Sequence, residues 1–352
     1  MAVTLALSMA LERGALAATP LPGLRALERP GALASGRGVV RRLRWPEGVR
    51  VVAVGGATLG GSGKTPLAIA CAAELGSRGA RVALVGHAYR ASPGCARLVS
   101  QGDRLSEVGD EALVAARQLA GVARVVVAPT RAAAVAFAAR VADVLVLDGV
   151  AQTTPVRASL ALLAVDAAEP WGHARALPPR GDLRAPVRSL LDAADRVVAL
   201  GDELDGSSAP PEGAAHVQVG SRGVQVGEEL LAWDAVRPLR VGLVCALARP
   251  ERILRALSRR GVEPVAVIRG PDHGPIRWPG RARTSAGAPV DARVDAGVDL
   301  WLATPKCALH ARGLPFSAPL GVLEQSLSLP GSLRDALTAA AMGHTLQMSR
   351  ND

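Results

Sequence analysis

The residues most able to do chemistry stand in one glycine-rich run, Thr58-Leu59-Gly60-Gly61-Ser62-Gly63-Lys64-Thr65. In such a loop the backbone N–H groups can cradle phosphate oxygens, the lysine can reach the β- and γ-phosphates, and the threonine hydroxyl can hold Mg²⁺. The run follows an apolar stretch at 51–54, a predicted buried strand, and it opens a helix predicted over 64–75. The strict pattern has glycine where Thr58 stands. This context favours a loop that binds a nucleoside triphosphate over a chance glycine-rich turn.

Carboxylates that could complete such a site occur at two other places. Asp148 ends an apolar run at 144–147, so we expect it to help hold the metal; the alternative is a simple Asp-Gly turn at a strand end. Asp110 and Glu111 begin a helix predicted over 108–120. A carboxylate at a helix N-terminus stays ionised, which suits a base or a metal contact, but it is also common as a helix cap.

The elements that must position these residues alternate regularly between short apolar strands and helices. This alternation predicts a parallel sheet with helices on both faces. A stretch rich in Gly, Ser and Pro at 201–213 is interpreted as a linker, after which a second strand–helix series begins. We therefore predict an α/β protein with an N-terminal arm at 1–45, a phosphate-loop domain at 46–205, and a second, smaller domain at 206–352. Both domains are expected to be Rossmann-like α/β/α layers.

The composition limits the class of partner. The formal net charge is +10, which suggests an anionic partner, although only Lys64 and Lys306 among the 41 basic residues are lysines and an arginine-rich base composition explains part of the charge. Aromatic residues make up 2% of the chain, which argues against a protein that reads single-stranded nucleic acid by stacking. The four cysteines form no CxxC pair, and this favours a reducing compartment.

The N-terminal arm begins with a short apolar stretch and ends in a basic run. The apolar stretch, Met1 to Leu11, is too short to span a bilayer and lacks the basic start of a signal peptide. Arginines follow at 37, 41, 42 and 44. An apolar patch next to arginines is typical of an interfacial anchor on a cytoplasmic membrane face, and a frayed arm is the alternative.

Taken in order, several segments resemble the tetraacyldisaccharide 4'-kinases, the lipid A kinases of Gram-negative bacteria. That family also has Thr at the first loop position and Pro after the loop, as at Thr58 and Pro66. Further collinear matches extend to about residue 310. They are Val108-Gly109-Asp110-Glu111-Ala112-Leu113, Val127-Ala128-Pro129 with Arg131, Trp171-Gly172, Leu183-Arg184-Ala185-Pro186, Ala248-Arg249-Pro250-Glu251-Arg252, Pro271-Asp272-His273 and Thr304-Pro305-Lys306.

The resemblance implies transfer of the γ-phosphoryl group of ATP, with Mg²⁺, to the 4'-hydroxyl of a tetraacyl glucosamine disaccharide 1-phosphate. It implies a peripheral protein at the cytoplasmic face of the inner membrane, with the second domain closing over the substrate; a monomer without nucleic acid is expected. The implied residue roles are a base at Asp110 with His273 as its partner, metal contacts at Thr65, Asp148 and Glu111, and a substrate contact at Arg184.

The chain departs from the family pattern around Asp148 and Arg184. The family usually has Asp-Asp-Gly-Leu-Gln-His after the metal strand, whereas this chain has Leu147-Asp148-Gly149-Val150-Ala151-Gln152. Ala185 replaces a Glu. These departures leave open a divergent member that binds ATP but transfers phosphate weakly. A GTPase or a nucleotide-dependent metallochaperone ranks last, because no Asn-Lys-x-Asp guanine signature occurs.

Overall fold

The computed structural model describes residues 39–204, 211–278, 282–283 and 297–343. The expected arm therefore lies outside the described residues except for its end, 39–45. The chain divides into two compact units. Unit 1 contains the described residues up to Gly201, those at 211–218 and those from Leu327 onward; unit 2 contains 202–204 and the described part of Val219–Ser326. Within the described ranges, no helix combines the length and the apolar character that a membrane crossing requires.

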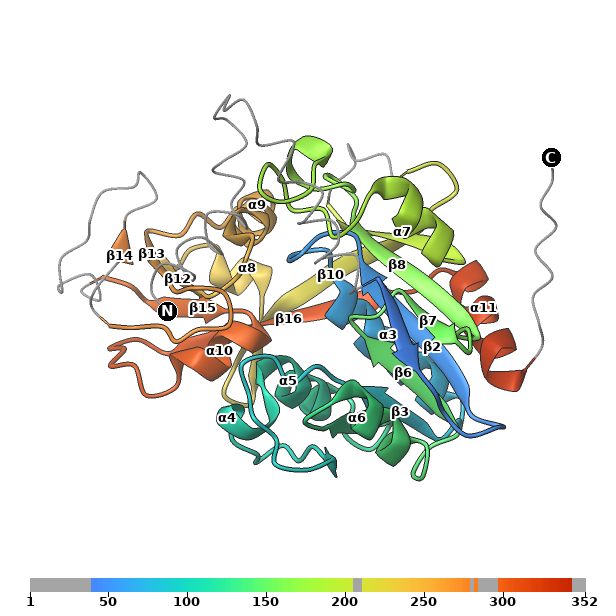
Figure 1. The fold of residues 1–352 in the computed structure, drawn as a ribbon. Coiled ribbons are helices and arrows are strands. Elements are labelled where there is room, and N and C mark those ends of the chain that lie inside the picture. The colour runs from blue at the N-terminus through green and yellow to red at the C-terminus, as the bar shows by residue number, and fades with distance from the viewer. Residues whose placement is uncertain (1–38, 205–210, 279–281, 284–296, 344–352) are drawn as a thin grey trace. The chain divides into compact units, whose positions relative to one another are not determined.

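Unit 1 is built on a mainly parallel sheet (Figure 1). Its strands, in spatial order, are β9 (Arg196–Asp202), β8 (Leu160–Asp166), β2 (Arg50–Gly56), β6 (Val144–Asp148), β3 (Val82–Val85), β5 (Arg124–Val127) and the antiparallel β4 (Arg97–Leu98). The central strands are apolar except at their ends, where Arg50, Asp148 and Asp166 lie, as expected of strands buried on both faces. A separate parallel pair joins β1 (Val40–Leu43), the end of the expected arm, to β7 (Gln152–Pro155).

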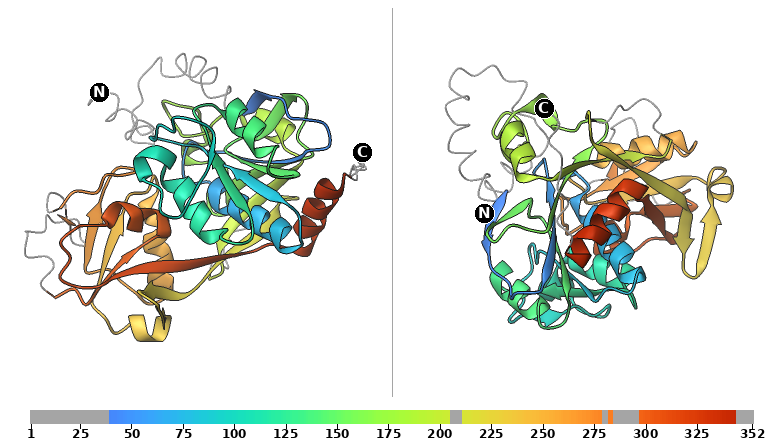
Figure 2. Two further views of the ribbon diagram at one scale, coloured as in Figure 1. Left: turned by 90° about the horizontal axis from the view of Figure 1, so that it is seen from below. Right: turned by 90° about the vertical axis from the view of Figure 1, so that its right-hand side faces the viewer.

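Helices cover both faces of this sheet, which confirms the predicted α/β class. On one face, α3 (Lys64–Ser77) packs on β2, β3 and β6, and α5 (Asp110–Gln118) and α11 (Gly331–Met342) pack beside it. Figure 2 shows α11, in red, beside the elements of unit 1. The apolar clusters of the other face include residues of α6 (Arg131–Ala138) and α7 (Val187–Ala193). The short helices α4 (Leu105–Val108) and η1 (His173–Arg175) lie in connections.

Unit 2 has a second set of mainly parallel strands. In spatial order these are β14 (Ala282–Arg283), β13 (Ala266–Arg269), β12 (Val241–Cys245), β15 (Leu300–Ala303), β16 (Leu320–Ser328) and β10 (Ala215–Val226), with β11 (Glu229–Ala232) paired to β10. Its helices are α8 (Trp233–Val236), α9 (Pro250–Arg259) and α10 (Pro305–Ala311). The fully buried Trp301 packs edge-on against Trp278, with ring centroids 6.0 Å apart, and anchors the core.

Three strands carry the chain across the boundary between the units. Within the described residues, the boundary falls after Gly201 in β9, after Gln218 in β10 and after Ser326 in β16; a fourth change of unit lies between 204 and 211, outside the described residues. The interpreted linker at 201–213 therefore begins inside β9, which continues to Asp202. The chain returns to unit 1 at Leu327, a feature that the single predicted boundary at 205/206 does not describe.

Candidate functional site

The glycine-rich run forms the connection between a central strand and a helix. β2 ends at Gly56 and α3 begins at Lys64, so residues 57–63 make the turn. Gly63 has φ of 80°, and a Cβ there would lie 2.9 Å from the Leu200 side chain, so both backbone conformation and space favour glycine. The Thr58 hydroxyl donates to the Gly60 carbonyl at 2.7 Å. The loop is therefore held in shape by its own groups.

A neighbouring segment holds the loop from outside. The Leu59 N–H donates to the Asp182 carbonyl at 2.8 Å, and the Arg184 N–H donates to the Ala57 carbonyl at 2.9 Å. The Arg184 guanidinium also reaches the carbonyls of Thr58 and Leu59, at 3.4 Å each. Burial, and then the charge of Arg41, lower the pKa of Arg184 from its usual value. The structure thus places the predicted substrate contact Arg184 against the phosphate loop.

The predicted metal residues Thr65 and Asp148 are in direct contact. β6 pairs with β2 so that Asp148 lies opposite Val54, at the carboxyl end of both strands. The Thr65 hydroxyl donates to Asp148 Oδ2 at 2.7 Å. Asp148 is 1% exposed, and its Oδ1 is buried without a hydrogen-bond partner among the described residues. One oxygen of a buried carboxylate therefore remains to be satisfied.

The electrostatic surroundings of Asp148 disfavour its charge. Burial and the nearby Glu111 carboxylate raise its pKa, whereas Lys64, the Thr65 hydroxyl and Arg131 lower it, and the result is a pKa of about 6. A divalent cation would reverse this balance and would satisfy the orphaned oxygen. The carboxylate and hydroxyl oxygens present here therefore fit Mg²⁺, which prefers few protein ligands alongside phosphate and water. Within the described ranges, no group of three or more His, Cys, Asp or Glu side chains forms a metal cage.

The predicted base and its neighbour begin α5. Gly109, with φ of 84°, precedes the helix, and Asp110 is 4% exposed with Oδ1 accepting the Glu111 N–H at 2.8 Å. The Glu111 charge acts on Asp148, Arg131 and His87, so it lies near the carboxyl ends of the strands. Both carboxylates lie in the first turn of α5, at the positive end of the helix dipole.

Three cationic or basic side chains at this edge were not among the sequence-based site residues. Arg131 Nη1 donates to the carbonyls of Val85 at 3.0 Å and Gly86 at 3.5 Å. His87 is partly exposed to solvent. Partial burial of its ring is the main cause that lowers its pKa to about 4, and the Arg131 charge is the next. Arg41 of β1 acts on both and on Arg184. His87 and Arg131 each follow a short apolar run of the sequence, at 82–85 and 125–128. Residues just after such strands are expected at the carboxyl edge of a parallel sheet. Arg41 follows no such run.

The residues that depart from the family pattern are packed in the interior of unit 1 or hydrogen-bonded within it. Leu147 and Ala185 are buried in apolar clusters. Ala151 packs where a Cβ on Gly55 would lie. The Gln152 amide is used internally, because its Oε1 accepts the N–H groups of Thr153 and Ala158 at 2.9 and 2.8 Å. At these positions the chain has apolar or internally bonded side chains in place of the Asp, Gln, His and Glu of the family pattern.

The predicted partner His273 belongs to unit 2, in a cluster with Asp272 and Lys306. Lys306 Nζ donates to Asp272 Oδ1 at 2.8 Å and lies 3.2 Å from His273 Nε2. Their side chains are 12–18% exposed. The structure therefore brings together the two segments 271–273 and 304–306. The pairing of His273 with Asp110 of unit 1 stays a prediction.

The parallel sheet, the loop between β2 and α3, and the adjacent Asp148 define a protein of the phosphate-loop class. The model of the family Tetraacyldisaccharide-1-P 4'-kinase matches residues 32–288. A tetraacyldisaccharide 4'-kinase from Anaeromyxobacter sp. (strain Fw109-5) is 37% identical over 72% of this chain and 73% of that protein. One from Rhodospirillum centenum is 35% identical over 85% and 88%, and one from Geobacter sulfurreducens is 34% identical over 92% of each.

The chain therefore belongs to the tetraacyldisaccharide-1-phosphate 4'-kinase family, as its resemblance implied, and it is an enzyme of the kinase class. Among solved structures, the "apo" form of LpxK from Aquifex aeolicus in complex with ATP has a TM-score of 0.62 and 18% identity, covering 91% of this chain and 97% of that one. This similarity shows a shared fold.

Proposed function

We propose that this kinase transfers the γ-phosphoryl group of ATP to the 4'-hydroxyl of a tetraacyl glucosamine disaccharide 1-phosphate. The observation that carries the proposal is the contact between Thr65 and Asp148, with the second Asp148 oxygen unsatisfied, in a chain of this family. Such a pair beside a glycine-rich loop suits a nucleotide with its metal. The ATP complex of the Aquifex protein supports ATP as the donor.

The loop residues would bind the nucleotide phosphates. The turn before α3 would supply backbone N–H groups to the phosphates, except that of Leu59, which is donated to the Asp182 carbonyl. Lys64 adds a positive charge that Arg cannot supply with the same compact geometry. Thr65, Asp148 and Glu111 are the residues that would hold Mg²⁺. When bound, Mg²⁺ would neutralise charge on the phosphate oxygens.

Asp110 is the proposed base. In the reaction, the 4'-hydroxyl oxygen forms a bond to the γ-phosphorus, the bond to the β-phosphate oxygen breaks, and the hydroxyl proton passes to the Asp110 carboxylate. That carboxylate lies in the first turn of α5, where the helix dipole suits a negative charge. His273 is proposed to orient Asp110.

Positive charge at the edge of unit 1 suits an anionic, membrane-derived substrate. The charges of Arg131, Arg41 and Lys64 act on the same region, beside the acidic Asp148 and Glu111. We propose that Arg184 contacts the substrate and that the protein works at the cytoplasmic face of the inner membrane. Each unit has the strand and helix content expected of a Rossmann-like α/β/α domain, which supports that finer description of the fold.

The test is a transfer assay on the detergent-purified full chain with [γ-³²P]ATP, Mg²⁺ and tetraacyldisaccharide 1-phosphate. We expect labelled lipid, a loss of about 100-fold or more for Lys64→Ala because phosphate charge is no longer neutralised, and wild-type rates for Arg78→Ala. The exposed Arg78 lies at the end of the same helix and pairs with the half-buried Glu74, so it controls for changes in α3. Absence of labelled lipid at micromolar enzyme over hours would contradict the proposal and favour a binding-only family member.

A further inference from the structure

Asp272, His273 and Lys306 form a cluster whose backbone is held by hydrogen bonds and by close packing. His273 has φ of 60° and Gly274 has φ of 60°, so two consecutive residues take the left-handed conformation. The His273 N–H donates to Asp272 Oδ1 at 3.1 Å, and the Gly274 N–H donates to the Pro271 carbonyl at 2.9 Å. The side chain of His310 from α10 occupies the space where a Cβ on Gly274 would lie. The conformation of the loop at 271–274 is therefore set in part by its packing against α10.

Lys306 is placed by the start of the same helix. The Thr304 hydroxyl caps α10 by accepting the Cys307 N–H at 3.3 Å, which puts Lys306 in the first turn. From there its ammonium reaches Asp272 Oδ1 at 2.8 Å and His273 Nε2 at 3.2 Å. It is one of the two lysines in a chain that otherwise uses arginine.

The chemistry of these contacts fixes the direction of the hydrogen bond. An ammonium group has three donors and no acceptor, so its contact with His273 Nε2 requires a lone pair on that nitrogen. The competing acceptor, Asp272 Oδ2, lies 3.5 Å from Nε2, a long distance for a hydrogen bond. The ring proton of neutral His273 is therefore placed on Nδ1.

We propose that Lys306 is a positioning residue that fixes His273 as the neutral tautomer with its proton on Nδ1. Nε2 accepts a hydrogen bond from Lys306 Nζ, so Nδ1 carries the ring proton. Asp272 holds the ammonium in place and balances its charge. The inference rests on the proposed function, because its catalytic consequence acts through the role proposed there for His273.

The direct test is long-range ¹H–¹⁵N spectroscopy on the full-length protein labelled with ¹⁵N-histidine. The chain has six histidines, and a His273→Gln variant assigns the signals of interest. We expect an unprotonated Nε2 and a protonated Nδ1 in the wild type. Lys306→Met should shift the proton toward Nε2, now facing Asp272, and Lys306→Arg should restore the wild-type pattern. Arg269→Met, which removes an exposed partner of Glu251 in the same unit, should change neither nitrogen.

A protonated Nε2 in the wild type would overturn the inference, and so would an unchanged tautomer in Lys306→Met. Kinetics separate this failure from failure of the proposed function. In an active wild type, Lys306→Met should lower kcat by about 10- to 100-fold, as loss of an orienting group does, with the KM for ATP within about twofold. An inactive wild type with the expected tautomer contradicts the proposed function alone. An active wild type whose kcat is insensitive to Lys306→Met contradicts the positioning role alone.

Discussion

Asp148 is the residue in which stability and proposed chemistry conflict. It ends a buried strand, its Oδ2 accepts the Thr65 hydroxyl, and its Oδ1 has no partner among the described residues. Burial is the largest cause of its raised pKa, and the Lys64 and Arg131 charges offset only part of it. A carboxylate kept in such a place costs the folded protein free energy, and a bound cation would recover it.

The pH dependence of stability follows from this raised pKa. The Asp148 carboxyl titrates at about 6 in the fold against an ordinary value of 3.8, so the folded state holds the proton more tightly. Stability conferred by this group is present below about pH 4 and is lost as pH rises through 6. Without nucleotide or metal, Asp148→Asn should therefore raise the free energy of unfolding above pH 6, by about 1–3 kcal/mol, and leave it nearly unchanged below pH 4.

Urea denaturation of both proteins at pH 4, 5, 6 and 7 measures this difference. Asp143→Asn is the control, because Asp143 is exposed and pairs with Arg81 at the surface, so its replacement should move the unfolding midpoint little. A difference between Asp148→Asn and wild type that stays constant across these pH values would show that the Asp148 carboxyl is not perturbed.

At the scale of elements, the site depends on how closely β2 and the segment after β6 approach each other. Asp148 and Val54 are paired, and the Gly149 N–H donates to the Val54 carbonyl at 2.9 Å. A Cβ on Gly55 would lie 2.6 Å from both Cα and Cβ of Ala151. The absence of a side chain at Gly55 therefore lets the metal strand lie beside the phosphate loop.

Gly55→Ala should accordingly destabilise the protein, by about 1–3 kcal/mol, because the backbone at Ala151 has to move. Thermal or urea unfolding measures the loss, and nucleotide affinity should fall with it. Gly94→Ala is the matched control: nothing lies within 4 Å of a Cβ there, and the backbone does not require glycine. Equal stability of the two variants would contradict the close packing.

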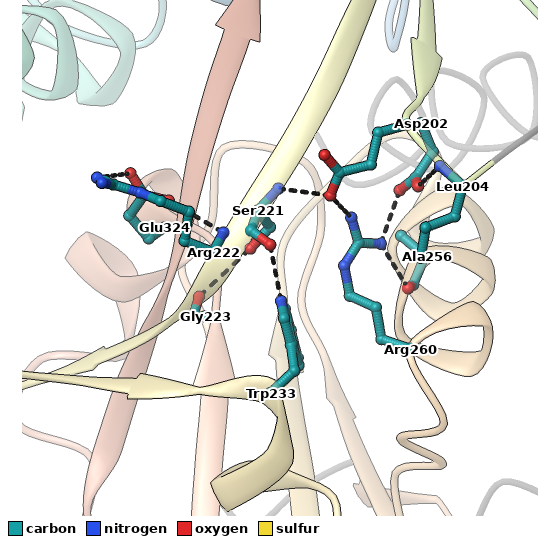
Figure 3. A network of polar contacts seen from close by, with 10 residues as sticks. Asp202, Leu204, Ser221, Arg222, Gly223, Trp233, Ala256, Arg260 and Glu324 are labelled. Atoms are coloured by element: carbon teal, nitrogen blue, oxygen red, sulfur yellow. Dashed lines mark hydrogen bonds and ion pairs between the residues drawn. The ribbon is translucent and has the colours of Figure 1, made fainter.

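At the scale of the whole molecule, the chain crosses between the units in three strands, and unit 2 secures one crossing by a buried arginine (Figure 3). Arg260, 6% exposed, follows α9 and binds Asp202 at 2.9 Å and Glu203 at 3.0 Å, both just beyond the first crossing. The same guanidinium donates to the Ala256 carbonyl at 2.9 Å and stacks over Trp233, 5.4 Å from the ring centroid. This network ties the incoming strand to the core of unit 2.

Arg260→Met should therefore lower the stability of unit 2, by about 2–4 kcal/mol, because Asp202 is left with a desolvated charge and the stacking on Trp233 is lost. Arg222→Met is the control: Arg222 pairs with Glu324 in the same unit at 3.1 Å, but its side chain is 75% exposed, so the expected loss is within about 1 kcal/mol. Tryptophan fluorescence during urea unfolding measures the loss in a background in which Trp45 and Trp171 of unit 1 are replaced by Phe, so that the signal comes from Trp233, Trp278 and Trp301 of unit 2. Similar unfolding midpoints for Arg260→Met and Arg222→Met would contradict the expected stabilising role of Arg260.

The sequence by itself determined the site elements of unit 1. The apolar run at 51–54, the loop and the helix from Lys64 are local patterns, and strand and helix signals of this kind depend on neighbouring residues in the chain. The same holds for the strand ending at Asp148 and the helix beginning at Asp110. The ordered motifs also indicated the family, which the comparisons confirm.

Only the tertiary structure decided which of these residues are in contact and how much free energy their burial costs. The pairing of β6 with β2 brings Thr65 to Asp148, and the packing of α10 brings Lys306 to His273, over separations that no local pattern encodes. Arg131 and Arg260 gain their importance from burial and from charges on distant segments, and the exposed Arg41 from its charge acting on such segments. The physical reason is that strand order and desolvation are properties of the packed chain, whereas helix and strand formation are largely properties of its neighbouring residues.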